Sequence, residues 1–535
     1  MKQIGFNTFL LTLLLVLNGC GDGGGGSALP IVPPVPEPDP SHPVSISGQV
    51  TYDLVPAKSD YVGLDYLNMR RESSKLVSVE AIDDVNNPIS STVTDANGHY
   101  SLEVPLNSQV KIRVYAKMIK TDQPVWNVKV VDNTNNNSVY VMEGAYSLAD
   151  TDTSTRNLHA PSGWAGTSYT STRVAAPFAM LDSVYYSMEK VLSAEPQAVF
   201  SPLLVNWSVN NKAASGDPAN GDIGTSYYYD RNLFILGDED SDTDEYDDHV
   251  IAHEWAHYYE DTFSRSDSVG GPHSDGEILD IRVALSEGWG NAFSAMALNA
   301  PVYFDTYGAS QSNGFNFNVE SEAKNNAGWY SEGSIQRILY DLFDSTNEGS
   351  DTINLGFAPI HKVFTGQEKT TPLFTSLFSF ITYLKDENPA EETEIDNIVA
   401  SEDIESITDI TGSGRTNKAS ELPEYTDLVL GSDVSICPSY TYGTYNKLGN
   451  RKYIRFNIST AGSYSISIRK NNTVSGSTDP DFYLHNMSTH TIDAVGEDAT
   501  ADMETQSVNL AAGSYLLDVY DYESISSACF NVTVN

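Results

Sequence analysis

The chain has 535 residues, enough for several domains. Its 72 acidic and 30 basic residues give a formal net charge of −42 at pH 7. Nucleic acid and anionic membrane surfaces are therefore poor partners for the folded protein, and the composition agrees with export.

Residues 1–19 predict a secretory signal peptide. A lysine precedes an apolar run, Phe9–Leu17, that is too short to span a bilayer comfortably. The run ends in "LNGC", which resembles the lipobox of bacterial lipoproteins. The resemblance implies cleavage before Cys20 and a lipid anchor on its sulfur, and Gly21 favours an outer membrane or cell-surface location. The alternative is a plain signal peptide with an incidental cysteine.

A glycine-rich and then proline-rich stretch, residues 20–45, predicts an extended tether. Residues 46–150 then alternate apolar and polar side chains over short runs such as "VKIRVYAKM" and "WNVKVVD", which predicts a β-sandwich. Within it, "TDANGHYSLEV" resembles the carboxypeptidase regulatory-like domain, a small transthyretin-like sandwich. That resemblance implies an accessory role rather than chemistry.

Residues 151–428 show a different pattern of apolar residues. A short strand is followed by several helical patterns, as expected of an α+β enzyme domain. The acidic run at residues 238–248 offers carboxylates for Ca²⁺, although a solvated loop that caps the next helix explains it equally well. The strand before this run is the predicted edge strand for pairing with an extended substrate. It consists of Leu233, Phe234, Ile235 and Leu236.

The stretch "HEWAH" carries the chemistry of this region. His253 and His257 are four residues apart, so a helix places both imidazoles on one face, within reach of one ion. Glu254 is then available to polarise a water molecule. This H-E-x-x-H arrangement is the zincin motif, and the alternative is a chance match in a buried helix.

A catalytic zinc site needs a third protein ligand. The metzincin pattern is excluded, because Glu260 and Phe263 occupy its glycine and histidine positions. Downstream, "ALSEGWGNAFSAM" places Glu287 on a second helical pattern and resembles the corresponding run of thermolysin-like and fungalysin-type gluzincins. The resemblance implies that Glu287 joins the two histidines around Zn²⁺. Asn291 stands where those families carry an aspartate that hydrogen-bonds a ligand histidine, and it brings no charge.

The segment "NNAGWYSEGSIQRILYDLF" resembles the thermolysin segment that supplies an oxyanion-stabilising histidine, yet it contains no histidine. Our hypothesis is that the phenol of Tyr330 takes this role. The alternative is that Tyr330 only packs.

Residues 429–535 again alternate as strands and resemble the bacterial pre-peptidase C-terminal domain, a β-sandwich. In an oxidising compartment Cys437 and Cys529 would close this segment as a disulfide, with two buried thiols as the alternative. Asp479 and Asp481 are a second candidate for Ca²⁺, against the simpler interpretation of solvated turn residues.

The sequence thus predicts a multidomain fold, an α+β zincin-like domain between two all-β sandwiches. The predicted function is a secreted, lipid-anchored zinc metallopeptidase of the gluzincin type, acting on proteins or peptides, with an endopeptidase as the family-level expectation. One alternative is a weak or inactive surface lipoprotein that binds protein or polysaccharide. The other is a gluzincin aminopeptidase.

Overall fold

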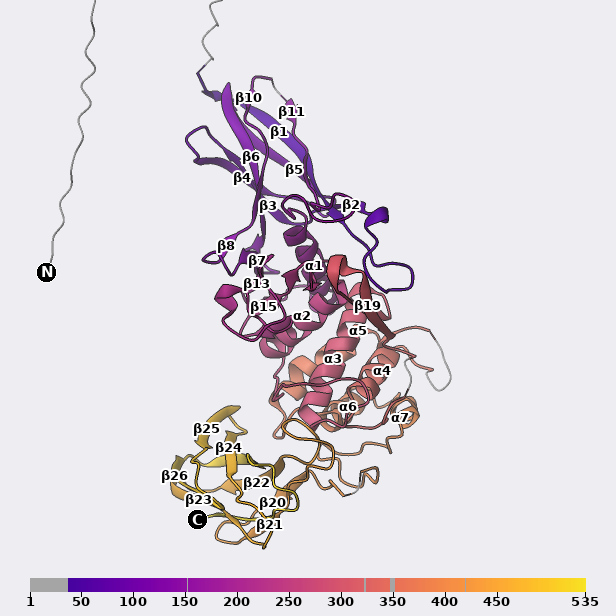
Figure 1. Ribbon diagram of the computed structural model, residues 1–535, viewed down its shortest axis with the longest axis vertical. Helices are drawn as coiled ribbons and strands as arrows, with labels where there is room; N and C mark the ends of the chain where they lie inside the picture. The colour runs from indigo at the N-terminus through magenta and orange to yellow at the C-terminus, as the bar shows by residue number, and fades with distance from the viewer. Residues whose placement is uncertain (1–36, 152, 322–323, 347–351, 419) are drawn as a thin grey trace, which may run out of the picture.

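The computed structural model describes residues 37–151, 153–321, 324–346, 352–418 and 420–535. The molecule is multidomain and elongated, with sheets at both ends and helices between them (Figure 1). Among the described residues, no helix is both long and apolar enough to cross a membrane. The predicted signal peptide, Cys20 and most of the tether lie outside these residues, so they stay predictions.

The N-terminal strands alternate buried and exposed side chains, as the sequence predicts. They are β1 (Asp39–Leu54), β2 (Arg70–Ser73), β3 (Val77–Ile82), β4 (Pro88–Val93), β5 (His99–Leu106), β6 (Ser108–Lys120), β7 (Trp126–Asp132), β8 (Ser138–Val139), β9 (Val141–Glu143), β10 (Ser147–Ala149), β11 (Thr153–Thr155) and β12 (Leu158–Ala160). β1 pairs with β2, β5, β11 and β12, and the remaining strands of this group belong to a second sheet.

This second sheet continues into the middle of the chain. β13 (Leu203–Trp207) pairs in parallel with β7 on one side and with β15 (Asn232–Ile235) on the other, and β14 (Tyr227–Tyr229) follows β15. The first sandwich is therefore not a separate accessory module ending at residue 150. Alternation identified the strands, but which strands pair is decided by contacts between distant segments.

Helices form the middle of the molecule. They are α1 (Ala176–Ala194), α2 (Asp248–Phe263), α3 (Ile281–Leu298), α4 (Glu332–Phe343), α5 (Phe357–Val363), α6 (Leu377–Glu387) and α7 (Glu392–Ser401). Helix α3 is apolar nearly all round and is buried between α2 and α4. Its Phe293 stacks on Trp255 of α2, with ring centroids 5.4 Å apart.

Short strands border these helices. β16 (Gly237–Asp238) and β17 (Asp242–Thr243) precede α2, and β18 (Val302–Tyr307) and β19 (Asn313–Asn318) form a hairpin after α3. The loop after β1 reaches this hairpin, since the Asn316 side chain donates to the Asp60 carbonyl at 3.1 Å.

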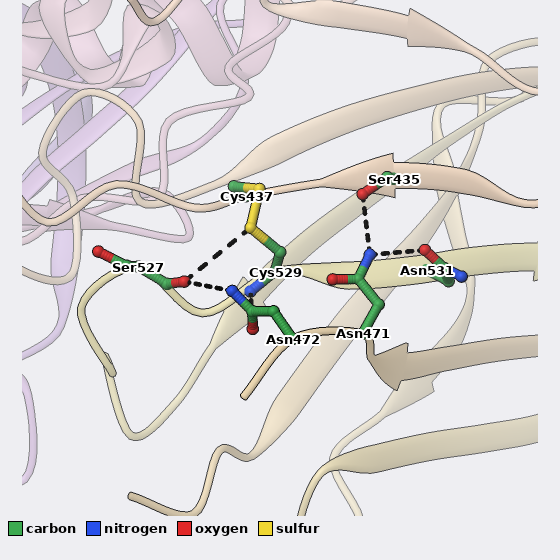
Figure 2. The surroundings of a disulfide bond; sticks show 7 residues. All are labelled: Ser435, Cys437, Asn471, Asn472, Ser527, Cys529 and Asn531. Carbon is green, nitrogen blue, oxygen red and sulfur yellow. Dashed lines mark hydrogen bonds between the residues drawn. A yellow bond between two sulfur atoms is a disulfide. The ribbon is translucent and has the colours of Figure 1, made fainter. Parts of the chain in front are cut away.

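The C-terminal strands form a sandwich with its own core. They are β20 (Tyr425–Asp427), β21 (Val434–Ile436), β22 (Lys452–Ile458), β23 (Gly462–Lys470), β24 (Pro480–Asn486), β25 (Thr491–Gly496), β26 (Met503–Leu510), β27 (Gly513–Asp521) and β28 (Phe530–Val534). Cys437 and Cys529 form a disulfide beside the paired strands β21 and β28 (Figure 2). The predicted pairing is thus present in the structure.

A buried charge network joins this sandwich to the helices. Arg282, in the first turn of α3, donates to Asp518 of β27 at 3.0 Å and to Asp280 at 2.9 Å. The Tyr453 hydroxyl donates to the same Asp280 carboxylate at 2.6 Å. Because an unpaired buried charge is costly, this arrangement fixes the sandwich against the start of α3.

Candidate metal centre

Helix α2 presents both histidines of "HEWAH" on one face. His253 Nε2 and His257 Nε2 lie 3.2 Å apart. The helix starts beside Asp247, whose carboxylate accepts the backbone N–H of Thr306 at 2.8 Å. The beginning of the helix is thereby tied to β18.

Glu287 of α3 completes the cluster. Its Oε2 lies 3.3 Å from His253 Nε2 and 3.5 Å from His257 Nε2. Zinc ligands at about 2.0–2.2 Å in a tetrahedral arrangement are about 3.4 Å from one another. The spacing of these three atoms therefore fits a single Zn²⁺ with one position left open.

Two glycines of α3 make this approach possible. A Cβ on Gly290 would lie 2.6 Å from His253 Cε1, and one on Gly288 would lie 2.7 Å from Ile335 Cβ. Larger residues would push α3 away from α2 or α4. The two glycines of "SEGWG" are thus explained by packing around the candidate centre.

Asn291 orients the first histidine, as the sequence predicts for this position. Its Oδ1 lies 2.9 Å from His253 Nδ1, and its Nδ2 donates to Gln336 Oε1 at 2.9 Å. Since the amide nitrogen is occupied by Gln336, the amide oxygen faces the imidazole. This leaves His253 Nε2 directed at the cluster.

The second histidine has a charged partner that sequence reasoning missed. Glu260 Oε2 lies 3.3 Å from His257 Nδ1 and also accepts from the Ser286 hydroxyl at 2.6 Å. Carboxylates commonly orient ligand histidines in this way. The available signal was the spacing of three residues after His257, which places Glu260 on the next turn of the helix.

Glu254 lies beside the cluster and lines the cavities on both sides of it. Burial raises the pKa of its carboxyl, against the opposing charges of His253 and His257. Burial likewise opposes ionisation of Glu287, but the charge of His257 and hydrogen bonds from both histidines hold its pKa well below the usual value.

Tyr330 does not belong to this group. Its hydroxyl donates to the Ala327 carbonyl at 2.9 Å, and its ring packs against Trp329. Neither cavity beside the cluster is lined by Tyr330. The structure therefore does not bring the Tyr330 phenol to the cluster, because a local turn already uses this hydroxyl.

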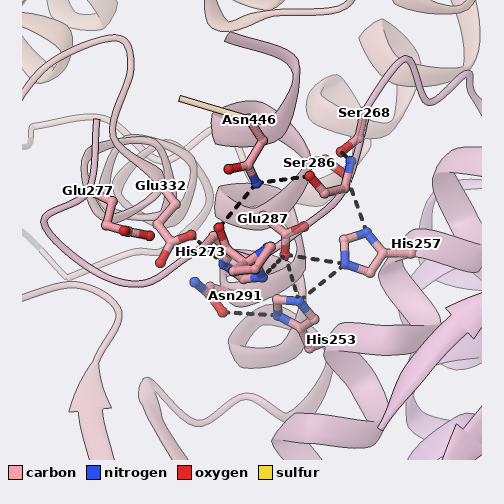
Figure 3. Close-up of polar contacts among 12 residues, drawn as sticks. His253, His257, Ser268, His273, Glu277, Ser286, Glu287, Asn291, Glu332 and Asn446 are labelled. Atoms are coloured by element: carbon pink, nitrogen blue, oxygen red, sulfur yellow. Dashed lines mark hydrogen bonds and ion pairs between the residues drawn. The ribbon is translucent and has the colours of Figure 1, made fainter. Parts of the chain in front are cut away.

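The structure brings His273 to the cluster instead (Figure 3). Its Nε2 lies 3.1 Å from Glu287 Oε2, and its Nδ1 lies 2.7 Å from Glu332 Oε2. Burial opposes a charge on this imidazole, but the hydrogen bond with Glu332 and the charge of Glu287 raise its pKa to about 9. The resemblance pointed to a segment after Glu287, whereas His273 precedes that glutamate in the sequence. The available signal was a histidine in the loop between the two helices that carry the candidate ligands.

The C-terminal part of the chain holds the loop that carries His273. The Asn446 side chain donates to the carbonyls of Gly270 and Pro272 at 2.8 and 3.1 Å. Lys447 Nζ also donates to the Pro272 carbonyl at 2.7 Å. The segment before β22 is thus part of the support of the candidate centre.

The predicted edge strand is also corrected. Strand β15, which contains Leu233, Phe234 and Ile235, is paired on both sides and has no free edge. Leu236 follows this strand and is buried. The outer strand is β14, whose three tyrosines line a cleft of about 1000 Å³ together with both histidines and Glu254.

A second cavity of about 590 Å³ lies on the other side of the cluster. His253, Glu254 and His273 line both spaces, so the cluster stands where they meet. Aromatic side chains of the β18–β19 hairpin, Tyr303, Phe315 and Phe317, form part of the second wall.

One family model matches part of the chain. Residues 193–398 match the model of the mycolysin C-terminal domain, and this segment contains α2, α3 and the loop between them. No curated protein matches the chain.

Several solved structures resemble parts of the chain. The pre-peptidase C-terminal domain of a Bacillus anthracis collagenase is 18% identical, with 21% of this chain and 94% of that chain covered and a TM-score of 0.17. A family 35 carbohydrate-binding module from Clostridium thermocellum is 17% identical, with 19% and 86% covered and a TM-score of 0.13. The Aeromonas hydrophila periplasmic lysozyme inhibitor PliG is 10% identical, with 21% and 96% covered and a TM-score of 0.14. Of these comparisons, it is the family match over residues 193–398 that associates the helical middle of the chain with metallopeptidases.

Proposed function

We propose that the protein is a zinc-dependent peptidase. The observation that carries the proposal is the mutual spacing of His253 Nε2, His257 Nε2 and Glu287 Oε2, which are 3.2, 3.3 and 3.5 Å apart. Zinc, when bound there, would polarise the scissile carbonyl and lower the pKa of a water molecule. The match with a metallopeptidase-associated family supports this assignment.

Glu254 is the proposed general base. It follows the first ligand histidine directly and faces the cleft, so its carboxylate can take the proton of the attacking water. The same group can then pass the proton to the leaving amine. Its raised pKa, caused by burial, brings it closer to the working pH at which such a shuttle is efficient.

His273 is the proposed hydrogen-bond donor to the oxyanion. Glu332 engages Nδ1, which leaves Nε2 directed at the cleft beside Glu287. A donor fixed in this way can stabilise the negative charge that develops on the carbonyl oxygen. This role replaces the one that the sequence suggested for Tyr330.

Strand β14 is the proposed docking edge for substrate. It lies at the free end of the large sheet and lines the cleft, so an extended peptide can add to it as a further strand. Main-chain pairing of this kind does not require a free substrate terminus. It therefore favours an endopeptidase over the aminopeptidase alternative.

Zinc content and hydrolysis, measured together, test this function. Residues 21–535 would be produced as wild type and as Glu254→Gln, with zinc determined by mass spectrometry and unfolded casein as substrate. About one zinc per chain in both proteins is expected, with cleavage only by the wild type and lost to a chelator. Zinc without cleavage would favour the binding lipoprotein, and a folded protein without zinc would overturn the assignment.

A matched peptide panel tests the mode of cleavage. The same internal sequence would be offered with a free and with a blocked amino terminus. Equal cleavage of both peptides is expected of an endopeptidase, whereas a strict need for the free amine would favour an aminopeptidase. The lipid predicted on Cys20 would place this activity at a bacterial outer membrane or cell surface.

A further inference from the structure

Three carboxylates meet beside the second cavity. Asp242 lies on β17, Asp244 follows it, and Asp305 lies on β18 after helix α3. Each offers one oxygen, and the three oxygens lie within 4.8 Å of one another. All three residues line the cavity of about 590 Å³ that also borders His253 and Glu254.

The most buried of the three has an unsatisfied oxygen. Asp244 is only 3% exposed, and its Oδ1 has no hydrogen-bond partner in the part of the chain that the structure describes. Its other oxygen accepts from Ser226, whose own Oγ accepts the Leu236 N–H at 3.0 Å. Asp242 Oδ1 is likewise buried without a partner among the described residues. Burying an unpaired carboxylate costs folding free energy, so a positive charge at this place would stabilise the structure.

We propose that Asp242, Asp244 and Asp305 form a site for a single Ca²⁺ ion. Calcium takes six to eight oxygen ligands and accepts irregular geometry. Three carboxylates supply the protein part of such a shell, and water from the open cavity supplies the rest. A doubly charged ion offsets three negative charges better than the single charge of a lysine or arginine side chain.

The electrostatics agree with this geometry. Burial and the charge of Asp238 raise the pKa of Asp242 to about 6, and burial and Asp242 raise that of Asp305 to about 7. Burial and the charges of its acidic neighbours, first among them Asp305, raise the pKa of Asp244 as well. Without a cation these carboxylates repel one another, and a bound ion removes that repulsion.

The site takes two residues of the acidic run at 238–248 and adds Asp305, which lies outside that run. Several acidic side chains of residues 238–248 are engaged elsewhere in the fold: Glu245 with Arg173, Asp247 with Thr306 and Asp248 with Ser183. Asp242 and Asp244 instead face Asp305, which is far away in sequence.

The ion would link two walls of the second cavity. Asp242 and Asp244 belong to the segment that leads into α2, whereas Asp305 belongs to the hairpin that supplies Phe315 and Phe317. A cation held by both would fix the hairpin against the start of the metal-binding helix. This proposal does not rest on peptidase activity.

Calorimetric titration with CaCl₂ tests the site, on zinc-loaded residues 21–535 carrying Glu254→Gln to prevent self-digestion. We expect one calcium per chain with a dissociation constant below about 1 mM and a rise in the thermal unfolding midpoint. Asp305→Asn should weaken binding at least about tenfold, because it removes one charged ligand. The matched control is Asp240→Asn, an exposed residue of the same run, which should bind as the parent does.

Unfolding midpoints of the calcium-free proteins show whether a loss of binding comes from the missing ligand or from a damaged fold. Asp305→Asn removes one of three repelling charges, so its unfolding midpoint without calcium should equal or exceed that of the parent. Absence of saturable binding by the parent at millimolar calcium would overturn the proposal. Equal affinity of the Asp305→Asn protein, or equally tight binding of Mg²⁺, would overturn it as well.

Discussion

His273 Nε2 lies 3.1 Å from Glu287 Oε2, while its other ring nitrogen contacts Glu332 at 2.7 Å. The imidazole thus contacts Glu287 but does not belong to the group of His253, His257 and Glu287, whose ligand atoms all lie within 4.8 Å of one another. This position suits a hydrogen-bond donor to substrate and explains why a histidine from a loop without periodicity belongs to the site.

Replacing His273 by alanine should lower kcat/KM for peptide hydrolysis by about 10²–10³-fold, since one oxyanion donor is lost. Zinc content should stay near that of the wild type. The control is His99→Ala, which removes an exposed histidine of the first sandwich. An unchanged rate would contradict the assignment, and loss of zinc together with activity would make His273 a ligand instead.

Asn446 supports this loop from the C-terminal side, through hydrogen bonds to the carbonyls of Gly270 and Pro272. Asn446→Asp keeps the shape of the side chain but removes the donor and sets a carboxylate against two carbonyl oxygens. We expect about a tenfold loss of kcat/KM with zinc retained, because His273 is no longer held in position. Asn509→Asp, an exposed change in the same sandwich, should leave the rate unchanged. Equal rates of the two variants would show that the loop does not need this support.

Asn291 accepts from His253 and is itself held by Gln336. Asn291→Ala should weaken zinc binding by about 10–100-fold, as loss of a group that orients a ligand histidine does. Asn291→Asp should bind zinc at least as well as the wild type, because Gln336 can turn its amide to donate to the new carboxylate. Competition with a chromophoric chelator measures both, and equal affinity of the alanine variant would contradict the role.

The elements that carry the candidate metal ligands could be predicted because their signals are local. Two histidines four residues apart on a helix must share a face. A glutamate on the next helix can reach that face when the chain folds back. The structure has α2 and α3 where these patterns stand. The multidomain architecture with sandwich-like sheets followed from alternation in the same way, whereas the continuation of one N-terminal sheet into the middle of the chain did not.

The features that the sequence did not predict correctly depend on contacts between distant segments. The free edge belongs to β14 rather than β15, since the pairing of β15 with β13 is set by tertiary structure. Asp305 joins Asp242 only because the hairpin after α3 folds back on the segment before α2. Tyr330 was proposed because it lies in a segment that resembles one of thermolysin. In the structure its hydroxyl donates to a nearby backbone carbonyl.

The pH dependence of the unfolding free energy should reflect the ionisation of Glu368, a buried carboxyl away from the candidate metal centre. Burial raises the pKa of Glu368 from 4.5 to about 8, although Ser379 donates to it at 2.7 Å. The native state therefore holds a proton that the unfolded state releases above about pH 4.5. Stability from this group is complete below that pH and is lost as pH rises toward 8, by up to about 1.4 kcal/mol per pH unit.

Glu368→Gln should remove this loss, because an amide of the same shape does not ionise. In the Glu254→Gln background, the thermal unfolding midpoint at pH 8.5 should rise relative to the parent, while at pH 5 the two proteins should differ little. Glu103→Gln, an exposed glutamate on β5, serves as the matched control and should leave the pH profile unchanged. The unfolding midpoint of the parent should fall more between pH 5 and 8.5 than that of Glu368→Gln. If the two midpoints fall equally, Glu368 is ionised in the native state. The buried Glu368 Oε2, which has no hydrogen-bond partner among the described residues, would then need a compensating charge nearby.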